Sequence, residues 1–208
     1  MAIEDKASKL AVFIRCLTDF TVVDEIGGNY QHIGATIADA VLQANMHYET
    51  HVRPRVTRIR NIFPKAATIT GLRKLLSEQT VNDFLNWRGM DRAKRFQDIV
   101  NLFSSEGIDS EEDLKNWLMN DRNLMKLDTI QGIGPKTIDY FKILTGIQTC
   151  AIDRRLFDFL KKAGIETSDY HEAKSIINST ADIMRIPRAY LDHSIWEYIG
   201  RGSSLICK

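Results

Sequence analysis

Cysteine is scarce in this chain of 208 residues, which holds only Cys16, Cys150 and Cys207. They lie far apart and form no Cys-x-x-Cys pair, whereas cysteine-based zinc and iron–sulfur sites use closely spaced ligands. The sequence therefore predicts no metal site of this kind. A sparse, odd number of cysteines also suits a reducing compartment, in which the three thiols would be inert.

Long apolar runs are also absent. No stretch approaches the roughly 20 apolar residues needed to span a bilayer. The first residues, Met1–Lys6, lack the basic start and apolar stretch of a signal peptide. We therefore expect a soluble, cytoplasmic protein with no membrane partner. Hydrophobic residues still make up 44% of the chain, which is enough to bury a sizeable core.

Acidic residues are missing from one segment, residues 51–77, although the net charge of the whole chain is only +1. The basic residues of this segment are Arg53, Arg55, Arg58, Arg60, Lys65, Arg73 and Lys74. Residues 106–113 are acidic by contrast. A basic stretch in a neutral chain is compatible with one DNA-facing surface, or with a solvated helical face.

Strand patterns are absent too: apolar residues do not alternate, and no Asn-Gly or Asp-Gly turn separates two such runs. Apolar residues instead recur at helical spacing, for example over residues 10–17, 37–44 and 96–103. We expect an all-α protein of about ten short helices joined by short loops. The predicted boundaries are caps at Thr70, Thr80 and Ser110, stops at Gly107, Gly164 and Gly200, and a last helix that begins at Pro187.

The most informative segment is Ile130–Thr137, where Gly132-Ile133-Gly134 separates two apolar-periodic segments and Pro135 opens the second. Two glycines make a tight turn with a bare backbone, and Ile133 can pack between the helices while neighbouring amides point outward. Free amides at a helix N-terminus suit a phosphate. The pattern predicts a helix-hairpin-helix whose DNA-binding residues are Gly132, Ile133, Gly134 and Thr137. A plain corner between two helices is the alternative.

Lys136 lies in the first turn of the second helix, where a cation is disfavoured by about 0.3–1 kcal/mol. Its side chain could extend to a phosphate or to solvent. Alternatively, the site lowers its pKa, so that a neutral amine acts as a nucleophile. Asp153 is predicted to cap a helix over residues 154–163. A capping carboxylate is rigidly held and ionised, so this role does not exclude chemistry.

The segments Ile130–Ile138 and Ile152–Arg155 resemble the signature of the helix-hairpin-helix DNA glycosylase superfamily, which includes endonuclease III. Lys136 matches the position of the family's Schiff-base lysine, and Asp153 matches its essential aspartate. A weaker similarity over residues 34–60 places Gln43 near the glutamine that fills the gap left by a flipped base. The alternative for Gln43 is an exposed helical position.

The resemblance implies an all-α, two-lobed fold with a DNA-binding cleft, formed by a lobe of residues 34–148 and a lobe of residues 1–33 plus 149–208. It implies a monomeric base-excision repair glycosylase with AP lyase activity, which removes a damaged, oxidised base from double-stranded DNA. Gln43 and Arg155 would join the DNA-binding residues. Without the four-cysteine cluster of endonuclease III, no cofactor is expected; a monovalent cation at the hairpin is compatible with the pattern.

Some features depart from the family or leave other functions open. Gln131 replaces the usual hairpin proline, and Arg155 stands where many members carry histidine. A non-catalytic DNA-binding module remains an alternative, as does a monofunctional glycosylase in which Asp153 acts through water. The histidines show no metal-ligand pattern: His32, His47, His51, His171 and His193. Four aromatic residues could stack on an extruded base, although we expect them in the core: Trp87, Tyr140, Phe141 and Trp196.

Overall fold

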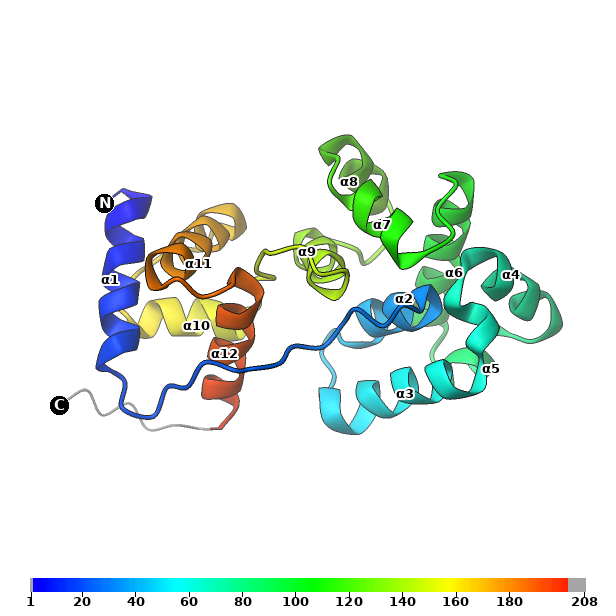
Figure 1. Ribbon diagram of the computed structural model, residues 1–208, viewed down its shortest axis with the longest axis horizontal. Helices are drawn as coiled ribbons and strands as arrows, with labels where there is room; N and C mark the ends of the chain where they lie inside the picture. Colours follow the sequence, from blue (N-terminus) through cyan, green and yellow to red (C-terminus); the bar gives the residue numbers. More distant parts are fainter. Residues whose placement is uncertain (1, 202–208) are drawn as a thin grey trace. The chain divides into compact units, whose positions relative to one another are not determined.

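All regular elements are helical in the computed structural model of the chain, which describes residues 2–201 (Figure 1). This range contains twelve α-helices and no strand, so the predicted all-α class is confirmed. None of the helices within it is long and apolar enough to cross a membrane. Cys207 lies outside the described residues.

The chain divides into two compact units. We call Gly28–Ile147 the central unit, and Met1–Gly27 together with Gln148–Lys208 the terminal unit. The sequence placed the corresponding boundaries at residues 34 and 148. Each unit has its own hydrophobic core.

The terminal unit combines one helix from the start of the chain with three from its end. They are α1 (Ile3–Cys16), α10 (Arg154–Lys162), α11 (Tyr170–Met184) and α12 (Arg188–Gly200). Helix α1 packs along α11, and α12 packs against α10 and α11. Its core includes Leu10 of α1 and Phe159 of α10, both fully buried.

The central unit holds the remaining helices. They are α2 (Ile33–Leu42), a π-helical turn (Tyr48–Val52), α3 (Arg53–Ile62), a 3-10 turn (Pro64–Ala67), α4 (Ile69–Glu78), α5 (Val81–Leu85), α6 (Met90–Ser105), α7 (Glu111–Leu118), α8 (Asp121–Asp128) and α9 (Pro135–Leu144). Helix α2 lies at the middle of this unit and packs against α3, α6 and α9. All ten of its residues are buried, as expected for a helix whose residues, apart from Thr36 and Asp39, have no polar side chain.

The predicted helix ends depend on single side chains, and most of them are confirmed. Ser110 forms a capping box with Asp113 at the start of α7, and Thr80 caps α5. The prediction for Thr70 is wrong. Thr68 caps α4 by accepting from the amide of Gly71 (3.0 Å), whereas the amide of Thr70 donates to the Asp109 carboxylate (2.7 Å).

Glycine and proline explain other ends. Gly107 and Gly164 adopt φ of +73° and +68° directly after α6 and α10, which is the left-handed geometry that ends a helix. Gly200 is instead the last residue of α12, and that helix begins at Arg188, one residue after the predicted Pro187.

The two ends of the central unit meet. The amide of Asn29 donates to the carbonyl of Leu144 (2.7 Å). Gly28 has φ of +116°, and a Cβ there would come within 2.8 Å of the Leu144 backbone. Only glycine fits this closure, because it permits both the φ and the close approach.

Candidate nucleic-acid interface

The hairpin between α8 and α9 has the geometry that its sequence predicts. Gly132 adopts φ of +83°, and the next residue, Ile133, is buried in the core while its amide donates to the carbonyl of Ile130 (2.9 Å). Open space surrounds Gly134, where an added Cβ would meet no atom within 4 Å. Pro135 then opens α9. The turn therefore buries its one apolar side chain and leaves bare backbone beside a helix N-terminus.

Lys136 and Gln43 come together from positions 93 residues apart, and Lys136 Nζ donates to Gln43 Oε1 (2.8 Å). Gln43 is the C-cap that directly follows α2, and its Nε2 is buried with no hydrogen-bond partner in the described part of the chain. Lys136 and Thr137, both half-buried, occupy the first turn of α9. Lys136, the candidate nucleophile, and Gln43, the candidate for filling the gap left by a flipped base, are thus direct neighbours.

Two arginines of α6 bind the backbone around this pair. Arg95 Nε donates to the carbonyl of Gln131 (2.9 Å), and its guanidinium fills the space that a Cβ on Gly132 would need. Arg92 Nη2 donates to the carbonyl of Ala44 (2.5 Å). Burial, together with the charge of Arg95, lowers the pKa of Arg92. Sequence reasoning missed both arginines, because only the fold shows that α6 runs beside the hairpin.

A fully buried carboxylate lies behind Lys136. Asp39 Oδ2 accepts hydrogen bonds from the hydroxyls of Tyr30 (2.6 Å) and Tyr48 (2.9 Å), and Oδ1 accepts one from Tyr140 (3.0 Å). Burial raises the pKa of Asp39, and the three phenol hydrogen bonds oppose that rise. Burial and the carboxylate together raise the pKa of the tyrosines. We call these four residues the Asp39 cage.

The Asp39 cage and the Lys136–Gln43 bond form one seam between α2 and α9. Asp39 and Gln43 are one helical turn apart on α2, as are Lys136 and Tyr140 on α9, so each pair lies on one helix face. The bond from Tyr140 to Asp39 and the bond from Lys136 to Gln43 therefore join the same two faces. The cage fixes the register of α9 against α2, and hence the place of the lysine.

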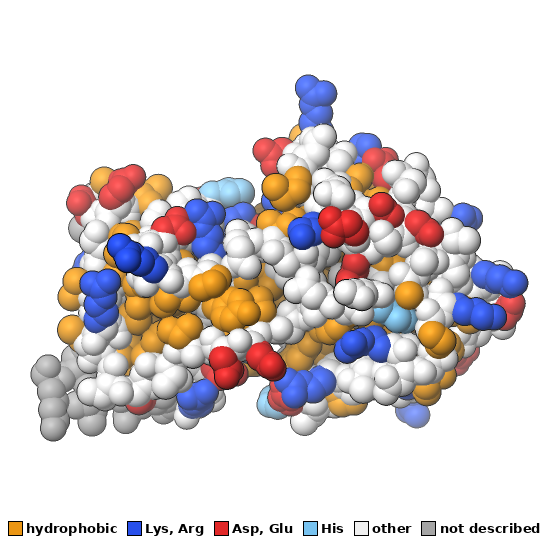
Figure 2. Space-filling view, viewed as in Figure 1, with side chains coloured by type: hydrophobic (Ala, Val, Ile, Leu, Met, Phe, Trp, Pro, Cys, Tyr) orange, Lys and Arg blue, Asp and Glu red, His pale blue; other side chains and the backbone are white. Residues whose placement is uncertain are grey.

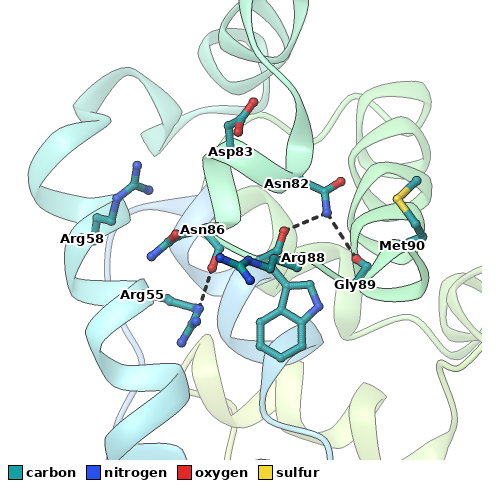
Figure 3. A pocket seen from close by; sticks show the side chains of 9 residues that line it. Arg55, Arg58, Asn82, Asp83, Asn86, Arg88, Gly89 and Met90 are labelled. Atoms are coloured by element: carbon teal, nitrogen blue, oxygen red, sulfur yellow. Dashed lines mark hydrogen bonds between the residues drawn. The ribbon is translucent and has the colours of Figure 1, made fainter.

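A basic groove of about 1020 Å³ opens elsewhere on the central unit (Figure 3). Its walls come from α3, which supplies Arg55 and Arg58, and from the loop between α5 and α6, which supplies Trp87 and Arg88. Arg55 and Arg58 belong to the predicted basic stretch. Trp87, which we expected in the core, is half-buried at the groove. Figure 2 shows acidic side chains gathered instead over α7, where the acidic stretch falls.

In the terminal unit, Asp153 caps α10 as predicted. Its Oδ1 accepts from the amides of Arg155 (2.8 Å) and Leu156 (3.1 Å). The Arg155 guanidinium lies 4.1 Å from the ring centre of Trp196 and also donates to the carbonyl of that residue (3.2 Å). His193 stacks on the same ring. Arg155 therefore contributes to packing within this unit, and its DNA contact stays a prediction.

The candidate catalytic residues fall in different units, Lys136 in the central unit and Asp153 in the terminal unit. Within residues 2–201, no group of three or more His, Cys, Asp or Glu side chains is placed to hold a metal ion.

The model of a family described as "Domain of unknown function (DUF8548)" matches residues 15–200. No curated protein and no solved structure matches the chain.

Proposed function

We propose that this chain, which belongs to the DUF8548 family, binds double-stranded DNA through its helix-hairpin-helix, removes a damaged base and nicks the strand. The observation that carries the proposal is Lys136, an amine held by Gln43 in the first turn of α9, directly after the glycine turn. The resemblance to the helix-hairpin-helix DNA glycosylases supplies the reaction class.

Phosphate binding follows from the backbone of the turn. The first amides of a helix have no partner within it, and they lie at the positive end of its dipole. In α9 the first residue is Pro135, which has no N–H, so the amides of Lys136 and Thr137 are the first that can face an anion. A phosphate can approach them over Gly134, which has no side chain to obstruct it.

The reaction on this proposal begins when the neutral amine of Lys136 attacks C1′ of the damaged nucleotide. The C1′–N bond to the base breaks, and the base leaves with the electron pair and gains a proton. One amine proton passes to the departing base. The C1′–O4′ bond then breaks, O4′ keeps the electron pair and takes the second amine proton, and an imine forms between Lys136 and C1′. Loss of a proton from C2′ then expels the 3′ phosphate, and water releases the lysine.

Asp153 would support this reaction electrostatically. A rigid carboxylate can stabilise positive charge that develops on the sugar, or it can accept a proton from the lysine. Both cap hydrogen bonds use Oδ1, and this leaves Oδ2 for such a role. Asp153 and Lys136 belong to different units. The variant Asp153→Asn therefore tests the role of Asp153 separately from that of Lys136.

Borohydride trapping tests the proposal. Duplexes with an oxidised purine, an oxidised pyrimidine or an abasic site are incubated with the protein, and borohydride is added to reduce any imine. We expect a covalent adduct that is lost in Lys136→Gln and retained in Lys74→Gln, the matched control on the exposed face of α4. Failure to trap an adduct with any of these duplexes would refute the lyase mechanism.

One observation favours a second function, that of a non-catalytic DNA clamp. The hydrogen bond from Lys136 to Gln43 suits a charged ammonium that assists phosphate binding just as well as a nucleophile at rest. The clamp predicts duplex binding without base release. A monofunctional glycosylase predicts base release that persists in Lys136→Gln and is lost in Asp153→Asn.

A further inference from the structure

The basic groove of the central unit has features that the hairpin chemistry does not use. Arg55 and Arg58 line one wall from α3, and Arg88 faces them from the loop between α5 and α6 (Figure 3). Arg88 is exposed, and no group within residues 2–201 pairs with its guanidinium. A surface that collects three guanidinium groups repels itself unless an anion is bound.

Backbone carbonyls, rather than carboxylates, hold two arginines of the groove. Arg55 donates to the carbonyls of Asn86 (3.0 Å) and His51 (2.6 Å), and Arg58 donates to that of Phe84 (2.9 Å). A carbonyl holds a guanidinium in place without neutralising it, and each guanidinium has five N–H donors, so several remain. The one carboxylate that lines the groove, Asp83, accepts from the hydroxyl of Thr80 (2.6 Å).

The loop that carries Trp87 and Arg88 is held in one conformation. Asn82 Nδ2 donates to the carbonyls of Trp87 (2.8 Å) and Gly89 (3.4 Å). Asn86 adopts a left-handed φ of +48° at the end of α5, which an asparagine tolerates better than most residues. A loop fixed in this way loses little conformational freedom when a ligand binds.

Trp87 connects the groove with the hairpin. The centre of its ring lies within cation–π distance of both Arg55 (5.3 Å) and Arg92 (4.7 Å). Arg92 holds the carbonyl of Ala44, beside Gln43, and Arg95 holds the hairpin carbonyl of Gln131. A series of guanidinium groups therefore runs from the groove, past the indole ring of Trp87, to the hairpin turn. In the proposed function, this turn binds a DNA phosphate.

We propose that this groove is a second binding site for the phosphate backbone of duplex DNA, on a strand that the hairpin also holds. Guanidinium groups match phosphate oxygens in pairs of hydrogen bonds, and DNA supplies anions at regular intervals, as a row of separated guanidinium groups requires. The inference rests on the DNA binding in the proposed function. It adds a contact surface that does not depend on Lys136 chemistry.

The test measures affinity for a short undamaged duplex as a function of salt concentration. The slope of log K against log salt is negative, and each phosphate that a protein neutralises makes it steeper by about 0.9. Arg88→Ala should therefore make this slope shallower by about 0.9, and it should weaken DNA binding about eightfold at 0.1 M salt. Lys115→Ala removes the same charge from α7, the acidic helix of the same unit, and should leave the slope unchanged.

An unchanged slope in Arg88→Ala, or the same reduction in Arg88→Ala and Lys115→Ala, would overturn the inference. Borohydride trapping of the same proteins on an abasic duplex separates this result from the proposed function. An adduct without an Arg88 effect means that the groove proposal fails and the lyase stands. An Arg88 effect without an adduct means that the groove stands and the lyase fails.

Discussion

The Asp39 cage offers the sharpest stability prediction, because one fully buried carboxylate accepts hydrogen bonds from three tyrosines. Asp39→Ala leaves all three hydroxyls without their acceptor. A hydrogen bond to a charged group contributes about 1.5–3 kcal/mol, although bonds in one network do not add independently. We expect Asp39→Ala to lower the free energy of unfolding by about 3–5 kcal/mol, which is a large part of the stability of an ordinary domain.

Conservative variants should cost less. Asp39→Asn keeps an oxygen for two of the phenols, while the third hydroxyl can rotate to accept from the new amide, so a loss of about 1–2 kcal/mol is expected. Tyr140→Phe removes one donor and preserves the ring, and we expect a similar loss. A loss in Tyr140→Phe, which keeps the volume of the ring, identifies the hydrogen bonds rather than the volume of the side chain as the stabilising feature.

The pH dependence has a definite sign. Burial raises the pKa of Asp39 above its ordinary 3.8, so the folded state disfavours the ionised carboxylate relative to the unfolded chain. Its contribution to stability is complete below pH 3.8 and is lost as the pH rises through the raised pKa. Asp39→Asn does not titrate. The free energy of unfolding of the native protein minus that of Asp39→Asn should therefore fall with rising pH, by about 1.4 kcal/mol for each unit by which the fold raises the pKa.

Urea unfolding followed by tryptophan fluorescence provides the measurement. In a Trp196→Phe background the signal comes from Trp87 and Trp117, which both lie in the central unit. The slope of the transition should stay constant while its midpoint moves. A loss below 0.5 kcal/mol in Asp39→Ala, or a native-minus-Asn difference that grows with pH, would refute the reasoning.

Two further predictions concern the hairpin and the cap of α10. Gly132→Ala should lower the free energy of unfolding by about 1–3 kcal/mol, because a φ of +83° strains any other residue and the new Cβ displaces Arg95. Gly134→Ala should change the free energy of unfolding by less than about 0.5 kcal/mol and yet weaken DNA binding. Equal DNA affinity of Gly134→Ala and the native protein would contradict the proposed phosphate site. Asp153→Ala removes the acceptor of two amides and should lower the free energy of unfolding by about 0.5–2 kcal/mol, whereas Asp153→Asn still caps α10 and should lower it by only a few tenths. Thermal unfolding followed by the fluorescence of Trp196, in the terminal unit, compares the two variants. Equal losses would contradict the capping role.

Local features were predictable from the sequence because a few neighbouring residues determine them. The hairpin turn, the Ser110 capping box and the Asp153 cap each depend on side chains within four residues of the backbone that they satisfy. The error at Thr70 has the same origin. Two threonines compete for one helix start, and a distant residue, Asp109, determines which of them serves as the cap.

The Asp39 cage was not predicted, although one signal of it stands in the sequence. An aspartate within the apolar segment of residues 33–42 must be buried, and a buried carboxylate needs partners. Which residues supply them depends on how α2, α9, the loop with Tyr30 and the π-helical turn with Tyr48 pack, and no local pattern encodes that. The same limit applies to Arg92 and Arg95, whose spacing on α6 says nothing about the hairpin they reach.

The arrangement of the chain, with one unit inserted into the other, has a consequence for biosynthesis. The apolar face of α1 leaves the ribosome early, but its partner α11 begins only at residue 170. At ordinary translation rates this helix waits on the order of ten seconds. The central unit is complete before then, and the bond between Asn29 and Leu144 closes it on itself. We therefore expect the 28–147 segment to fold first on the nascent chain, while α1 is a natural target for a chaperone until the last helices emerge.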